Sequence, residues 1–216
     1  MKEWKEFLPA VMLHLPGCPE LVVEDALRVA AIEFCETTRV WKEEYVTLAV
    51  TAAGFQDYAV SNNPKDAGLC HLHAAWVGEY EVGVGLPGSD QNFYPGQTED
   101  AVLNYRYQNT RNYSIEIVGR ATIRINPVPN ATPKTIVATV SYCPTPVAFG
   151  FPDGLYFKHH EAIEKKAMYN LMIQVDKPWS NPQMAMVNLA RFDYLKDAAA
   201  NANGPVRRTP LRVSPI

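Results

Sequence analysis

The sequence DGLYFKHHEAIEKKAMYNLMIQV at residues 153–175, followed by DKPWSNP at 176–182 and QMAMVNLARFDYLKDAAANA at 183–202, predicts two helices joined by a tight turn. In each helix, side chains that can form one buried face recur at steps of three or four. They are Tyr156, His160, Ile163, Ala167 and Leu171 in the first helix, and Ala185, Leu189, Phe192, Leu195 and Ala199 in the second. Such a hairpin needs a third partner to cover its apolar faces.

The turn between these helices carries its own signals. Pro178 cannot continue a helix, so the first helix ends before it. Two caps fit the start of the second helix. Ser180 with Gln183 matches a capping box, whereas Asn181 followed by Pro182 matches a side-chain cap with proline at the first helical position.

The third partner is a helix predicted from Glu20 to about Trp41. Its apolar side chains line one side at helical spacing, and Val22, Ala26 and Val29 widen that surface. This helix is therefore expected to contact more than one neighbour. The expected core of the helical part is Leu27, Phe34, Trp41, Ile163, Leu171, Trp179, Leu189 and Phe192.

Between the helical ends, the apolar period changes to that of β-strands. Alternation begins at Tyr45 and returns in several short runs up to Tyr142, with glycine-containing and proline-containing turns between them. The sequence thus predicts an α+β protein: an antiparallel helical bundle built from both chain ends, with an inserted antiparallel β-sheet or sandwich. The predicted divisions are residues 1–44, 45–149 and 150–203, followed by an extended C-terminal arm at 204–216.

Composition excludes several classes of protein. The 216 residues carry a net charge of −3, which argues against a general nucleic-acid binder. No apolar run is long enough to span a membrane, and the acidic residues near the start make a poor signal peptide. The four cysteines show no CxxC pairing, so they are interpreted as small buried thiols in a reducing cytoplasm.

Two sites remain as alternatives to a purely structural protein. His71 and His73 share one face of a predicted strand, as two metal-ligating imidazoles often do, with Asp66 and Glu79 as conceivable further ligands. A metal-dependent enzyme centred on this pair is one alternative. The other is a glycan-binding or ligand-binding β module that uses the loop 85–96, with Phe93 and Tyr94 as contacts. No catalytic, cofactor-binding or metal-binding residue is assigned.

Three separated blocks resemble a family of tailed-bacteriophage proteins. They are LPGCPELVVEDALRVAAIEFCETTRVW at 15–41, IRINPVP at 123–129 and FPDGLYFKHHEAIEKKAMYNLMIQVDKPWSNPQMAMVNLARF at 151–192. Together they are similar to head-to-tail adaptors, also called connectors, which are structural proteins of the virion neck. The resemblance covers both helical ends, roughly half of the chain.

This resemblance implies a function that composition alone does not. It implies a homo-oligomeric ring, usually dodecameric, that sits beneath the portal protein, contacts tail or nozzle proteins, and encloses a lumen through which packaged DNA passes. Such a protein is made in the host cytoplasm, ends up in the virion neck, and needs no cofactor or membrane. Another neck or tail-completion ring protein is the alternative within the same class. The residues implied to contact the portal are Arg207, Arg208, Leu211, Arg212 and Ile216.

Overall fold

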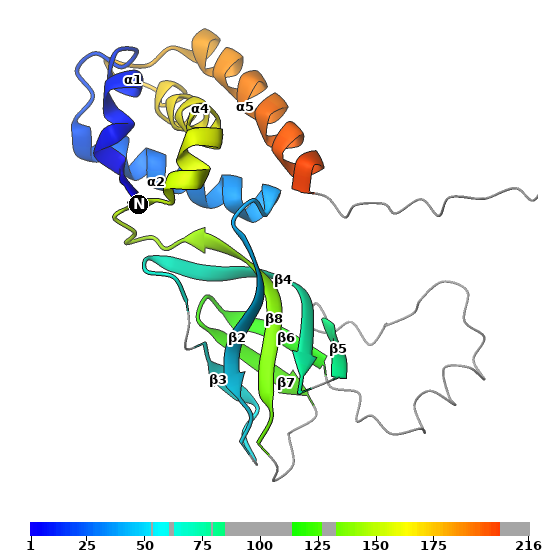
Figure 1. Ribbon diagram of the computed structural model, residues 1–216. Helices are drawn as coiled ribbons and strands as arrows, with labels where there is room; N and C mark the ends of the chain where they lie inside the picture. The colour runs from blue at the N-terminus through cyan, green and yellow to red at the C-terminus, as the bar shows by residue number, and fades with distance from the viewer. Residues whose placement is uncertain (53, 61–62, 79, 85–113, 127–132, 204–216) are drawn as a thin grey trace, which may run out of the picture.

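The computed structural model describes residues 1–52, 54–60, 63–78, 80–84, 114–126 and 133–203. Helices gather at one end of the molecule and the large sheet at the other (Figure 1), so the predicted α+β class is confirmed. In chain order the elements are β1 (Lys2–Glu3), η1 (Trp4–Glu6), α1 (Leu8–Met12), α2 (Glu20–Thr38), β2 (Lys42–Val50), β3 (Asp57–Ala59), β4 (Ala67–Val77), β5 (Tyr80–Val84), β6 (Ser114–Gly119), β7 (Thr122–Asn126), β8 (Thr135–Pro144), β9 (Gly150–Phe151), α4 (Asp153–Met172) and α5 (Pro182–Asn203).

The turn before α5 resolves the two alternative caps. The Asn181 side-chain oxygen accepts a hydrogen bond from the Met184 backbone N–H at 3.1 Å, and the Asn181 carbonyl accepts one from Ala185 at 2.9 Å. Pro182 is the first residue of the helix, where its missing N–H costs nothing because that group has no partner within a helix. Asn181, rather than Ser180, is therefore the cap.

A single apolar cluster joins the N-terminal segment to α2, α4 and α5. α2 contacts both α4 and α5, and Phe34 of α2 lies 6.4 Å from Phe192 of α5 between ring centroids. The expected core residues Leu27, Phe34, Ile163, Leu171 and Phe192 are fully or almost fully buried in this cluster, while Trp179 and Leu189 pack partly buried against it.

Lys166 links all three long helices at one point. It projects from α4, and its ammonium group lies 2.8 Å from the Glu33 carboxylate of α2. The same ammonium lies 5.3 Å from the centre of the Phe192 ring of α5 and 5.2 Å from the ring of Tyr169, so both π-faces attract it. The long aliphatic stem of the lysine fills space between the helices while its charge stays paired.

The predicted end of the first long helix, and with it the position of Trp41, was wrong. α2 ends at Thr38, because Arg39 adopts a left-handed conformation with φ 55° and its N–H closes the last turn on Cys35. Left-handed residues end helices in this way. The chain therefore turns toward the sheet, and Trp41 packs in the apolar core of the sheet, 5.9 Å from the Tyr142 ring, instead of in the helical cluster.

The large sheet has seven strands in the order β2-β8-β4-β5-β6-β7-β3. Most pairs are antiparallel as predicted, but β5 and β6 pair in parallel, with Gly83 opposite Ser114. The prediction of a wholly antiparallel unit was therefore wrong at this one pairing. β8 lies between β2 and β4, and its buried run of Ile136, Ala138, Val140 and Tyr142 forms the centre of the sheet core.

Two short strands fasten the N-terminus next to the end of the sheet. β1 pairs with β9, with Lys2 opposite Phe151 and Glu3 opposite Gly150. The backbones approach so closely that a Cβ atom at Gly150 would collide with the Lys2 carbonyl, so glycine is required there. The pairing places the first residues of the chain beside the segment that leads into α4. The sequence predicted only an irregular or short helical lead-in here.

A pair of aromatic residues on α5 tests the shared helical core. Phe192 is 1 % exposed and Tyr194 is 65 % exposed. We expect Phe192→Ala to lower the free energy of unfolding by about 3–5 kcal/mol, because a large ring is lost from the point where the helices meet. Tyr194→Ala should change it by less than about 0.5 kcal/mol. Equilibrium denaturation measures both. Equal effects of the two substitutions would mean that α5 does not pack on α2 through Phe192.

Candidate interaction surfaces

The segment between β8 and β9 presents two apolar side chains to solvent. Val147 is 79 % exposed and Phe149 is 77 % exposed, while Ala148 between them is buried. The buried Ala148 therefore holds the middle of this segment against the protein, and the larger side chains on either side of it are exposed. We call residues Thr145–Phe149 the anchored loop.

Hydrogen bonds from three distant parts of the chain hold the anchored loop in place. The Ala148 carbonyl accepts a bond from the Trp4 indole N–H at 2.7 Å and one from Arg28 Nε at 3.3 Å. On the other side, the Asp66 carbonyl accepts the Thr145 N–H at 2.9 Å, and its carboxylate accepts the Phe149 N–H at 3.5 Å. The loop backbone is thus preorganised, which lowers the entropic cost of binding through its exposed side chains.

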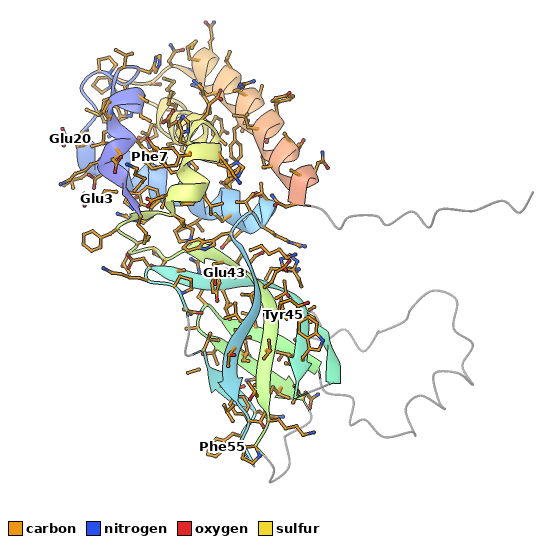
Figure 2. The ribbon with its side chains drawn as sticks, in the orientation of Figure 1. Glu3, Phe7, Glu20, Glu43, Tyr45 and Phe55 are labelled. Atoms are coloured by element: carbon orange, nitrogen blue, oxygen red, sulfur yellow. The ribbon has the colours of Figure 1, made fainter. Side chains whose placement is uncertain are left out.

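A groove of about 390 Å³ runs beside the anchored loop. Acidic and basic side chains from the N-terminal segment and α2 line it together with the loop itself: Glu3, Trp4, Lys5, Glu24, Arg28, Val147, Ala148 and Phe149. Apolar anchors surrounded by charges of both signs are typical of protein–protein contacts, where the charges select the partner. Figure 2 labels Glu3 at the helical end of the molecule.

The outer faces of α2 and α5 are a second candidate surface. Leu21, Val22 and Val29 of α2 are exposed, although the sequence placed Val22 and Val29 on an apolar surface. On α5, Met186, Val187 and Tyr194 are likewise exposed, on a helix that covers α2 and α4 from outside (Figure 1). Neither face has a covering element among the residues that the structure describes.

His71 and His73 lie side by side, but they are engaged within the protein. Their rings are 4.8 Å apart in an edge-to-face arrangement, and His73 Nε2 is 2.7 Å from the Ser141 hydroxyl. In the described part of the chain, no group of three or more His, Cys, Asp or Glu side chains is arranged to hold a metal ion. Asp66 faces the anchored loop, and Glu79 lies outside the described residues.

Two predicted contact segments also lie outside the described residues. They are the loop 85–96 with Phe93 and Tyr94, and the C-terminal segment 204–216 with Arg207, Arg208, Leu211, Arg212 and Ile216. Among the described helices, none is both long enough and apolar enough to cross a membrane.

Comparison with known protein families assigns the chain to one of them. The model of a family described as SU10 adaptor protein matches residues 4–214. The chain belongs to this family. The match extends through both helical ends, the sheet and the C-terminal segment, and it confirms the resemblance to tailed-phage head-to-tail adaptors. No match was found among curated proteins.

Membership of this family supports a structural role for this phage adaptor protein. The surfaces that can contact other proteins are therefore its candidate functional sites. The anchored loop was not found from the sequence, because the partners that fix it are far apart along the chain: Trp4 lies 144 residues from Ala148. One local signal was present. Val147 and Phe149 are large apolar residues within a segment that starts with Pro144 and Pro146, where neither a helix nor a central strand is expected.

We expect the protein to be less stable in acid because of the half-buried pair His71 and His73. Burial, and then the neighbouring His71, lowers the pKa of His73 from 6.5 to about 4, so the folded protein favours the neutral ring. As pH falls from 6.5 toward 4, the unfolded chain takes up this proton first, and we expect folding to weaken by about 1–2 kcal/mol after allowance for partial exposure. Denaturation at pH 7 and pH 4.5 measures the difference.

Matched variants separate this effect from general acid sensitivity. His73→Gln keeps a polar partner for Ser141 and removes the titration, so it should reduce the loss between the two pH values. His14→Gln, at an exposed histidine, should leave the loss unchanged. If His73→Gln lost as much stability in acid as the wild type, the attribution to His73 would be wrong.

Proposed function

We propose that this protein is a head-to-tail adaptor that forms a ring beneath the portal, joins the capsid to the tail, and lines the channel for packaged DNA. The observation that carries the proposal is the family match over residues 4–214. The proposed role is structural and requires no catalytic residue or cofactor. The proposed divisions are a helical domain from residues 1–44 and 150–203, arranged as an antiparallel bundle, a β domain at 45–149, and an extended arm at 204–216.

The outer helical faces support contacts between copies. Ring neighbours meet through two different surfaces, and a repeated contact of this type closes a ring when the rotation allows it. The exposed apolar residues of α2, such as Leu21 and Val29, and those of α5, such as Val187 and Tyr194, provide two such surfaces on different helices. We assign these two faces to neighbouring copies.

The anchored loop suits a contact with another protein of the neck. Exposed aromatic side chains on a fixed backbone are frequent hot spots, because little conformational entropy is lost when they enter a pocket. Phe149 has this character, and the charged groove beside it supplies selectivity. We assign the loop to the portal-facing contact.

The C-terminal arm is the second proposed portal contact. Its sequence GPVRRTPLRVSPI follows directly after α5 and combines three arginines with prolines and apolar residues, a composition suited to ordering on a preformed groove. Arg207, Arg208, Leu211, Arg212 and Ile216 are its proposed contacts. The net charge of −3 fits a channel wall, since like charge weakens contacts with DNA phosphates.

Removing the arm tests this assignment. Deletion of residues 204–216 should abolish docking on purified portal assemblies while leaving the unfolding midpoint unchanged, because the described helical core ends before the arm. A chain whose last thirteen residues are scrambled, with length and charge retained, is the control and should also fail to dock. Docking at full strength by the truncated chain would refute the arm assignment. Docking of the full-length protein on tail components instead of on the portal would favour a tail-completion ring.

A pair of exposed phenylalanines tests the anchored loop. Phe149→Ser should weaken binding to the portal about tenfold or more without loss of folding stability. Phe55→Ser is the matched control, since Phe55 is 63 % exposed and lies at the far tip of the sheet from the helices (Figure 2). Binding is measured by surface plasmon resonance on immobilised portal. Equal affinities for the Phe149→Ser variant and the wild type would remove the loop from the interface.

A further inference from the structure

The groove beside the anchored loop contains charges that the fold does not use. Two of its charged side chains, Glu3 and Lys5, come from the N-terminal segment. The other two, Glu24 and Arg28, come from α2. The guanidinium of Arg28 pairs with Asp25 at 3.0 Å and also donates a hydrogen bond to the anchored loop. Arg28 therefore stabilises the fold, and its charge is already balanced.

The carboxylates of Glu3 and Glu24 have no such partner. Within the part of the chain that the structure describes, neither side chain forms an ion pair or a hydrogen bond. Glu3 is exposed and Glu24 is half-buried. When Asp25 is counted with the groove, three carboxylates face the two cations Lys5 and Arg28. The groove thus has an excess of negative charge.

Strand pairing fixes Glu3 next to the apolar side of the groove. Glu3 lies opposite Gly150 in the β1–β9 pair, and Gly150 directly follows Phe149. The residue after Glu3 is Trp4, whose indole N–H donates to the Ala148 carbonyl at 2.7 Å. An unpaired carboxylate and an exposed phenyl ring are therefore held on neighbouring segments of one fixed backbone.

A partner segment that fills this groove needs a positive charge beside an apolar side chain. Covering a carboxylate without a counter-charge is costly, so the charges of the groove select the partner. Arginine fits because its planar guanidinium has five N–H donors and can serve two carboxylates, while its stem lies along apolar surface. The volume of about 390 Å³ lies within the range of ligand pockets, roughly 300–1,000 Å³.

We propose that the groove binds an arginine of the portal protein that has an apolar neighbour in its own chain. The guanidinium lies between Glu3 and Glu24, and the apolar side chain packs against Phe149. This inference rests on the proposed function, because it names the chemistry of the segment that the anchored loop contacts. An acidic residue at the same place is rejected by the negative groove, and the contact weakens as ionic strength rises.

Matched glutamine variants test the proposal in portal binding. The double variant Glu3→Gln/Glu24→Gln should bind immobilised portal about tenfold more weakly in surface plasmon resonance, with a smaller dependence on salt. Its unfolding midpoint should be unchanged, because neither carboxylate is paired in the described fold. Glu20→Gln is the control and should bind as the wild type does, since Glu20 is exposed on the first turn of α2 and does not line the groove (Figure 2).

A short peptide tests the groove without the portal. The probe is a capped Leu-Arg-Leu tripeptide, and its control is the same peptide with citrulline, which keeps the shape of arginine without its charge. Nuclear magnetic resonance of the full-length protein should show the amide signals of Glu3, Glu24 and Phe149 shifting with the arginine peptide. The citrulline peptide should bind about fivefold more weakly.

The outcomes separate this proposal from the proposed function. Equal portal affinities for the double variant and the wild type would overturn the arginine assignment and leave the adaptor role intact. Peptide shifts that are absent, or that do not depend on the peptide charge, would also overturn it. A portal that fails to bind the wild-type chain would refute the adaptor role, and the peptide result would still decide whether the groove selects arginine.

Discussion

The packing of Phe192 against Phe34, with Lys166 bridging to both helices, is the contact on which the rest of the structure depends. Phe34 belongs to α2 near the start of the chain, and Phe192 belongs to α5 near its end. Lys166 of α4 is paired with Glu33 of α2 and lies over the Phe192 ring. Since the isolated hairpin of α4 and α5 would expose an apolar face to water, α2 is required to cover it.

This constraint determines where the sheet and the exposed surfaces can lie. Because α2 and the two helices α4 and α5 pack in one cluster, the chain between α2 and α4 must leave the cluster and return. The chain leaves at Arg39 and returns through the anchored loop and β9. The return path is fixed by Trp4 and Arg28, which belong to the helical part, and by Asp66, which precedes β4. The contacts that join the helices to the sheet therefore also hold Phe149 exposed.

Much of the fold could be predicted from periodicity. The apolar spacing in α2, α4 and α5 is regular, so these helices were predicted close to their observed positions, and the change to strand alternation after α2 correctly marked the start of the sheet. Trp41 was misplaced because its spacing continues the helical stripe, while the left-handed conformation of Arg39 that ends α2 has no glycine or asparagine to signal it. Asn181 and Ser180 were both suitable caps, and only the three-dimensional path of the turn distinguished them.

The candidate sites were less predictable because they depend on contacts between distant residues. The parallel pairing of β5 with β6 joins strands separated by a long segment, and local patterns carry no information on such pairings. The anchored loop arises in the same way, because a tryptophan near the N-terminus fixes it. The family resemblance, by contrast, was visible in short local blocks, which is why the adaptor class could be inferred from the sequence.

Electron microscopy of the protein bound to its cognate portal tests the central claim most directly. The account predicts a closed ring of copies in which the cluster of α2, α4 and α5 is intact and the outer faces of α2 and α5 form the contacts between neighbours. Two results would contradict this claim. One is a portal decorated by separate copies. The other is a ring whose neighbours meet only through their sheets, with the outer faces of α2 and α5 in solvent.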